Sequence, residues 1–145
     1  MAPCGEWERV TVLGALGFEG MVGAMSIAAA TDGAVFHTYL EQVLLPELRR
    51  TKPDAVLVMD NLGAHKTPAV RALLDDAGFR YHYLPSYSPD LNPIELAWAK
   101  VKASLRKAAA WTVDGLHAAL GPALAAITAQ DAQGFFRHAG YACPN

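Results

Sequence analysis

The stretch Ser88-Pro89-Asp90-Leu91-Asn92-Pro93-Ile94-Glu95 decides how this chain folds, because it has the pattern of a helix start with an acidic residue in the first turn. Asparagine is a preferred N-cap residue, and proline suits the first helical position. We therefore expect Asn92 and Pro93 to fix the start of a helix that runs towards Lys107. Glu95 would project from the first turn of that helix.

A second acidic residue follows an apolar run upstream. Residues 55–59 are continuously apolar, short and rich in valine, a pattern typical of a buried strand. Asp60 comes directly after the run, and Asn61, Leu62 and Gly63 turn the chain away. We expect Asp60 to lie at the carboxyl end of this strand.

Two carboxylates from different elements can converge on a divalent metal that serves phosphoryl transfer. Each of the two also has a plain structural explanation. Glu95 could fold back onto the Asn92 backbone as a capping box, and Asp60 could close an Asx-turn. Spacing alone favours the capping box for Glu95 and leaves Asp60 balanced between the two explanations.

A family resemblance favours the chemical interpretation. The stretch Asp60-Asn61-Leu62-Gly63-Ala64-His65-Lys66, together with residues 84–95, resembles the DDE transposases of the mariner-like superfamily, in their bacterial insertion-sequence branch. In that family the second catalytic Asp ends a strand in a DN-x-x-x-H motif, and the catalytic Glu lies inside Y-S-P-x-L-N-P-I-E. The interval between Asp60 and Glu95, residues 61–94, also matches the family.

The resemblance covers nearly the whole chain and implies a function. Asp60 and Glu95 would be catalytic ligands of Mg²⁺ or Mn²⁺, and the activity would be DNA cleavage and strand transfer during transposition. Two alternatives stay open. One is a non-catalytic transposase remnant or a DNA or protein interaction module, and the other is a stand-alone ribonuclease H-like nuclease.

The order of elements agrees with this resemblance. Residues 10–16 and 21–27 read as a hairpin, and apolar residues at helical spacing follow between 35 and 48. The remaining sequence alternates helix and strand patterns and ends in three predicted helices. The helix over residues 113–127 should kink or split at its Gly-Pro pair. Such an α/β order, a mixed sheet with flanking helices, is similar to the ribonuclease H-like fold of DDE enzymes. We expect residues 1–145 to form one such domain.

One element of that fold is missing from the pattern. The family's first catalytic Asp lies on a central strand that precedes the hairpin, whereas Glu6 and Glu8 are the only acids before Val10 and follow no apolar run. We expect the domain to be incomplete at its N-terminus and to lack the family's helix-turn-helix region. The chain would then be inactive alone, unless another polypeptide supplies the missing strand and its Asp.

Candidate DNA contacts lie beside the acidic residues. His65 and Lys66 precede a predicted helix N-terminus, where a phosphate is favoured. Lys100, Lys102 and Arg106, with Lys107, form a basic cluster along the predicted Glu95 helix. The plainer alternatives are an ordinary surface histidine and a solvated helix face. Tyr87 and Trp111 could stack on bases, but they are weak candidates.

Composition limits the remaining possibilities. A net charge of -2 excludes a global basic field, so DNA must contact a local patch. The two cysteines have no metal-binding spacing, and no apolar run is long enough to span a membrane. We expect a soluble bacterial protein of the cytoplasm, associated with the nucleoid when on DNA. It would act as a homodimer, because transposition holds two DNA ends together.

Overall fold

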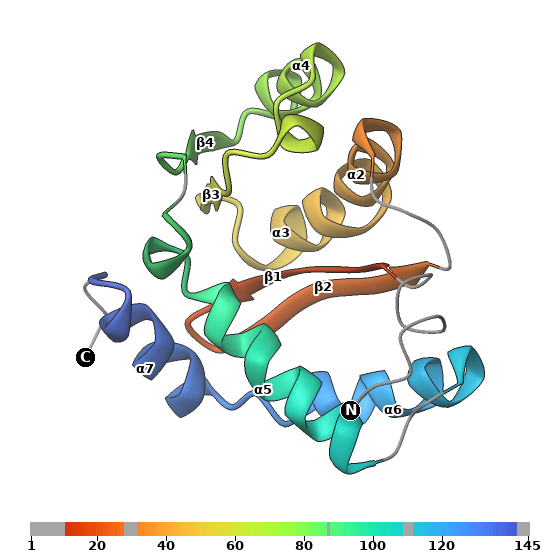
Figure 1. Ribbon diagram of the computed structural model, residues 1–145. Helices are drawn as coiled ribbons and strands as arrows, with labels where there is room; N and C mark the ends of the chain where they lie inside the picture. The colour runs from red at the N-terminus through yellow and green to blue at the C-terminus, as the bar shows by residue number, and fades with distance from the viewer. Residues whose placement is uncertain (1–10, 28–31, 87, 109–111, 142–145) are drawn as a thin grey trace.

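The computed structural model describes residues 11–27, 32–86, 88–108 and 112–141 (Figure 1). Strands β1 (Thr11–Gly17) and β2 (Gly20–Ile27) form the predicted antiparallel hairpin. The register shifts between Leu13 and Ala15, and opposite this irregularity Gly23 has a φ of +54°. Glycine adopts this left-handed conformation without steric cost, so β2 can pass close to the helix residue Leu44 there.

The helix after the hairpin is continuous but not uniform. It consists of α2 (Gly33–Tyr39), the π-helical segment η1 (Leu40–Leu44) and α3 (Leu45–Thr51). Asp32 caps its start by accepting a hydrogen bond of 2.9 Å from the Val35 N–H. The sequence pattern predicts one regular helix. Pro46, however, has no N–H to donate to the carbonyl of the preceding turn, and the wider π-turn lies just before it.

Strands β3 (Val56–Met59) and β4 (Arg80–Tyr83) pair in parallel through a crossover. The crossover contains η2 (Gly63–His65) and α4 (Pro68–Ala77). Thr67 caps α4, and Gly78 ends it in the left-handed conformation at φ 79°. The crossover therefore follows the turn and cap signals of the sequence.

The expectation that β3 is buried throughout is wrong for alternate residues. Leu57 and Met59 are buried, whereas Val56 and Val58 are 43% and 40% exposed. The continuous apolar run therefore has only one of its two faces covered in the described part of the chain. This exposure lies beside the cavity that is described below.

The last three helices are α5 (Ile94–Lys107), α6 (Val113–Ala125) and α7 (Ala129–His138), and the short η3 (Pro89–Leu91) precedes them. Pro122 lies inside α6, which continues as one element instead of splitting. Thr128 and Asp131 start α7 with a reciprocal capping box. None of the helices in the described ranges is long and apolar enough to cross a membrane.

Two apolar cores lie on opposite faces of β1. Leu13 and Ala15 pack against the core that α2, η1 and α3 share with β3. Val12 and Leu16 pack against the core formed by α5 and α6. Figure 1 shows these helices on the two sides of the hairpin. Within the described residues, β1 pairs with β2 and β3 pairs with β4, so two separate two-stranded sheets are present.

Candidate active site

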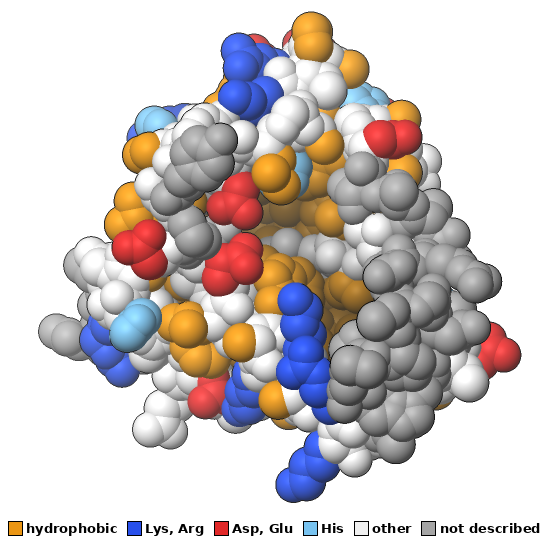
Figure 2. All heavy atoms as spheres, in the orientation of Figure 1, with side chains coloured by type: hydrophobic (Ala, Val, Ile, Leu, Met, Phe, Trp, Pro, Cys, Tyr) orange, Lys and Arg blue, Asp and Glu red, His pale blue; other side chains and the backbone are white. Residues whose placement is uncertain are grey.

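A cavity of about 680 Å³ lies between the two sheets. Figure 2 shows it as an apolar hollow with acidic side chains beside it. β1, β3 and the helical segment from α2 to α3 supply most of its lining, and residues at the start of α5 line it as well. Asp60, Asn92 and Glu95 all line this cavity.

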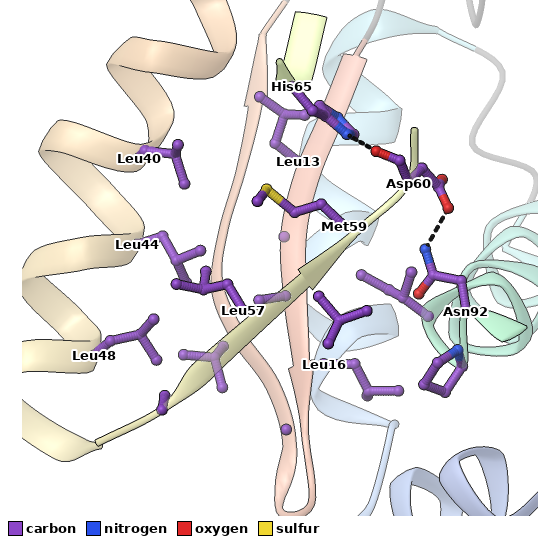
Figure 3. Close-up of a pocket in the computed structure, with 18 of the residues that line it drawn as sticks. Leu13, Leu16, Leu40, Leu44, Leu48, Leu57, Met59, Asp60, His65 and Asn92 are labelled. Atoms are coloured by element: carbon purple, nitrogen blue, oxygen red, sulfur yellow. Dashed lines mark hydrogen bonds between the residues drawn. The ribbon is translucent and has the colours of Figure 1, made fainter. Parts of the chain in front are cut away.

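Asp60 is held by hydrogen bonds on both its side chain and its backbone (Figure 3). Its Oδ1 accepts a hydrogen bond of 2.7 Å from Nδ2 of Asn92. Its carbonyl oxygen lies 3.2 Å from Nδ1 of His65. A carbonyl oxygen only accepts, so Nδ1 of His65 carries the proton and donates it. The carboxylate therefore has a defined position at the end of β3.

The predicted cap at the start of α5 is wrong. Pro93 occupies the N-cap position, and α5 begins without a side-chain cap hydrogen bond. The Asn92 side chain is committed to the Asp60 carboxylate instead and is buried, with 8% of its surface exposed. A charge-assisted hydrogen bond of this kind is stronger than a neutral cap. Asn92 therefore joins the two acidic elements rather than starting the helix.

Glu95 lies in the first turn of α5. Partial burial raises the pKa of its carboxyl group above the ordinary value, the charge of Asp60 raises it further, and Lys102 partly offsets both. The capping box of Glu95 on the Asn92 backbone is not formed, because α5 begins without a side-chain cap hydrogen bond. The Glu95 carboxylate therefore lines the same cavity as Asp60, and the charge of Asp60 raises its pKa.

His65 is part of the support for Asp60 and not an ordinary surface histidine. Its ring packs on Phe36, with the ring centroids 4.2 Å apart, and its carbonyl oxygen accepts a hydrogen bond of 2.5 Å from the Tyr83 hydroxyl. Burial lowers the pKa of His65, and the hydrogen bond and charge of Asp60 oppose that shift. The roles of Phe36 and Tyr83 had no signal in the sequence beyond their places in an apolar helix and an alternating strand.

The candidate DNA-binding residues divide into two groups. Lys100 is engaged within the protein, because its Nζ contacts the Asp131 carboxylate and donates to the Ala126 carbonyl at 3.2 Å. Lys102 and Arg106 are exposed on α5, and Lys66 is half-buried just after η2. Tyr87 and Trp111 lie outside the described residues.

Comparison with protein families identifies the chain. Residues 1–116 match the family described as DDE superfamily endonuclease. The chain belongs to this family. None of the curated proteins compared with the chain matches it significantly.

Solved structures show that the DDE endonuclease chain has the fold of the Mos1 transposase catalytic domain. The Mos1 catalytic domain with Raltegravir and Mg is 20% identical, with a TM-score of 0.71 over 90% of this chain and 68% of that one. The Mos1 mariner catalytic domain alone gives 20% identity and a TM-score of 0.70, over 90% and 67%. The Mos1 strand transfer complex gives 22% sequence identity and a TM-score of 0.64, over 84% of this chain. The chain spans 36% of the Mos1 chain in that complex.

The acidic residues of this DDE domain fit part of a metal site. Carboxylate oxygens are the ligands that Mg²⁺ and Mn²⁺ prefer. Asp60 and Glu95 line one cavity from two elements. Burial raises the pKa of Glu95, and the charge of Asp60 adds to that shift, so a cation between the two carboxylates would be favourable. Within the described ranges, however, no group of three or more His, Cys, Asp or Glu residues could hold a metal ion. The pair therefore fits as two ligands of a larger set.

Proposed function

We propose that the chain is the catalytic domain of a transposase from the bacterial insertion-sequence branch, which cleaves transposon ends and joins them to target DNA. The observation that carries this proposal is that Asp60, at the end of β3, and Glu95, in the first turn of α5, line a single cavity and that the Asp60 charge acts on Glu95. The family match and the likeness to Mos1 support it.

Asp60 and Glu95 would hold the divalent metal. When bound, Mg²⁺ or Mn²⁺ supplies charge that stabilises the attacking and leaving oxygens of phosphoryl transfer. Asn92 donates to one oxygen of the Asp60 carboxylate, which fixes the orientation of the other. His65 braces the backbone of the same residue. Structures of the Mos1 catalytic domain with Mg and with Mn support the choice of metals.

DNA would lie across the acidic end of the cavity and the adjacent face of α5. We assign backbone phosphate contacts to Lys66, Lys102 and Arg106, and we assign Lys100 to the contact between α5 and α7. A homodimer would bring two transposon ends together. Complexes of Mos1 with transposon ends and after strand transfer support DNA as the partner. We propose that transposition takes place on the DNA of the bacterial nucleoid.

A complete DDE site needs a third acidic residue. In the described part of the chain, Asp60 and Glu95 are the acidic residues that line the cavity. We propose that a further polypeptide segment supplies the third carboxylate, and that the chain is inactive without it.

The test compares two DNA substrates in the presence of Mg²⁺. The chain is supplemented by a peptide of apolar, strand-forming residues that ends in an aspartate and can supply the third carboxylate. One substrate carries the paired ends of the transposon that encodes the chain, and the other is a nonspecific labelled duplex. Cleavage and joining of the paired ends alone is expected. Equal cutting of the nonspecific duplex would identify a nuclease, and no reaction on either, despite metal binding, would identify a non-catalytic remnant.

Asp60→Asn should abolish the reaction, because it removes the charge of one ligand. The matched control is Asp76→Asn, which makes the same change at an exposed position on α4. Equal loss in both variants would contradict the assignment of Asp60.

A further inference from the structure

The segment just after α7 reaches back to the loop that precedes α5. The Tyr141 hydroxyl donates a hydrogen bond of 2.9 Å to the Leu91 carbonyl. Leu91 directly precedes Asn92, whose side chain donates to the Asp60 carboxylate. Glu95 follows in the first turn of α5. A tyrosine from a distant part of the sequence therefore contacts the stretch that carries the candidate site.

The end of α7 is a backbone turn that directs Tyr141 back onto the helix. Gly140 has a φ of +93°, a left-handed conformation that glycine adopts without steric cost. The Tyr141 N–H donates to the Phe136 carbonyl at 2.9 Å. The Gly140 N–H donates to the Arg137 carbonyl at 3.0 Å. These two bonds form a Schellman motif, in which the residue after the glycine often contacts the preceding turn. The Tyr141 ring accordingly meets Phe136 edge-on, with the ring centroids 5.8 Å apart.

α7 is itself attached to the rest of the chain at both of its ends. Phe136 packs against Phe18 in the turn of the hairpin, with the ring centroids 4.6 Å apart. Near the start of the helix, Asp131 contacts Lys100 of α5. Figure 1 shows α7 beside the hairpin and α5. The Tyr141 hydroxyl is therefore presented to the loop by a helix of fixed position.

The loop before α5 depends on hydrogen bonds, because its side chains bury little surface. Leu91 is 38% exposed, and Asp90 is exposed as well. Asn92 holds the loop on the side of β3, through its bond to Asp60. Tyr141 holds it on the side of α7, through its bond to the Leu91 carbonyl. The two bonds act on neighbouring residues from different directions, so together they restrict how the start of α5 can move.

We propose that Tyr141 is a positioning residue of the acidic site, which acts through this loop to hold Glu95 where it can share a cation with Asp60. The Glu95 N–H donates to the Asn92 carbonyl at 3.1 Å, so a shift of the loop displaces the first turn of α5. Tyr141 lines the same cavity as the two acidic residues. It lies outside residues 1–116, which match the DDE family. The metal-binding role of the two carboxylates rests on the proposed function.

The first measurement is amide hydrogen exchange of the full chain, without metal or DNA. Tyr141→Phe removes the hydroxyl and keeps the ring against Phe136. Exchange of the hydrogen-bonded amides of Leu91, Glu95 and Leu96 should become about three to ten times faster, which corresponds to the loss of one neutral hydrogen bond. Exchange in β3 and β4 should stay unchanged, because only a general destabilisation would accelerate it too.

Matched variants separate this contact from general effects of substitution. Tyr81→Phe removes a hydroxyl of β4 that donates to Asp75 at 3.1 Å, and it should leave the exchange of residues 91–96 unchanged. Gly140→Ala should accelerate that exchange, because alanine is strained at positive φ. Gly134→Ala adds the same methyl group inside α7, where space is open, and should not accelerate it. Circular dichroism checks that each variant folds.

The second measurement is the affinity for Mn²⁺, obtained from the electron paramagnetic resonance signal of the free ion. It is made at a temperature where circular dichroism shows that the natural chain and the variants are fully folded. Tyr141→Phe should weaken Mn²⁺ binding about threefold or more, the effect of losing one neutral hydrogen bond, whereas Tyr81→Phe should not weaken it. A tyrosine that only stabilises the fold would leave the affinity of the folded chain unchanged.

Four results would overturn the proposal. They are unchanged exchange of residues 91–96 in Tyr141→Phe, equal acceleration throughout the chain, the same acceleration in either control variant, and a Mn²⁺ affinity that Tyr141→Phe does not alter. If the natural chain binds no Mn²⁺, the metal assignment of the proposed function fails, and the exchange result alone decides the role of Tyr141. The two failures are therefore distinguishable.

Discussion

The side-chain amide of Asn92 donates a hydrogen bond of 2.7 Å to the Asp60 carboxylate and thereby joins the loop before α5 to the end of β3. Asn92 is buried, so this bond is shielded from water. The stretch that positions Glu95 is consequently tied to the other acidic residue of the site. One contact thus holds the Asp60 carboxylate beside the loop that leads to Glu95.

Removing this contact should destabilise the fold. Hydrogen bonds to charged groups contribute about 1.5–3 kcal/mol, so Asn92→Ala should lower the free energy of unfolding by about that amount. Urea denaturation measures the change. In an Asp60→Asn background the same substitution should cost less, because the charged acceptor is already gone. Equal costs in the two backgrounds would show that Asn92 acts elsewhere.

The Glu95 carboxyl should make stability depend on pH in a defined direction. Its pKa in the folded chain is raised by burial and then by Asp60, so the folded chain binds its proton more tightly than the unfolded chain does. Stability should therefore fall as pH rises above the unfolded pKa of about 4.3. Glu95→Gln should remove this decrease, whereas Glu41→Gln, at an exposed position, should preserve it. A decrease that persists in Glu95→Gln would contradict the assignment.

His65 should contribute the opposite slope at higher pH. Burial lowers its pKa in the folded chain, so the unfolded chain binds the proton more readily. Stability should be complete above the ordinary pKa of about 6.5 and should be lost as pH falls from there towards the folded pKa. His65→Phe keeps a ring against Phe36 and should abolish this dependence. Thermal melts across this pH range measure it, and an unchanged slope would exclude His65 as its source.

Lys100 and Lys102 should separate stability from DNA binding. Lys100→Met breaks the contact with Asp131 and should lower the melting temperature. Lys102→Met should leave the melting temperature unchanged and lower the slope of log affinity against log salt by about 0.9, the value for one lost phosphate contact. Fluorescence anisotropy of a labelled duplex provides the slope. A lower melting temperature in Lys102→Met, together with a smaller salt slope in Lys100→Met, would contradict the two assignments.

Local signals predicted much of this fold. The caps Asp32, Thr67 and Thr128 and the glycine after α4 are residue types that are preferred at these positions, and each acts on neighbours in the sequence. The strand before Asp60 and the helix of Glu95 were also predicted.

The predictions that the structure corrects have a common cause, which is contact between residues far apart in the sequence. Asn92 has a perfectly suitable residue type for a cap, yet an acceptor 32 positions away along the chain takes its side chain. Val56 and Val58 have the composition of buried residues, and their exposure depends on what lies across the cavity. The sequence does not distinguish Lys100 from its basic neighbours, but in the structure Lys100 contacts Asp131 of α7. Sequence spacing carries no information on such contacts.

The most direct test of the central claim is anomalous diffraction from crystals of the chain soaked in Mn²⁺. The account predicts a manganese peak in contact with the carboxylates of both Asp60 and Glu95, and loss of that peak in Asp60→Asn. A peak that contacts neither carboxylate, or no peak at this end of the cavity at saturating Mn²⁺, would contradict it.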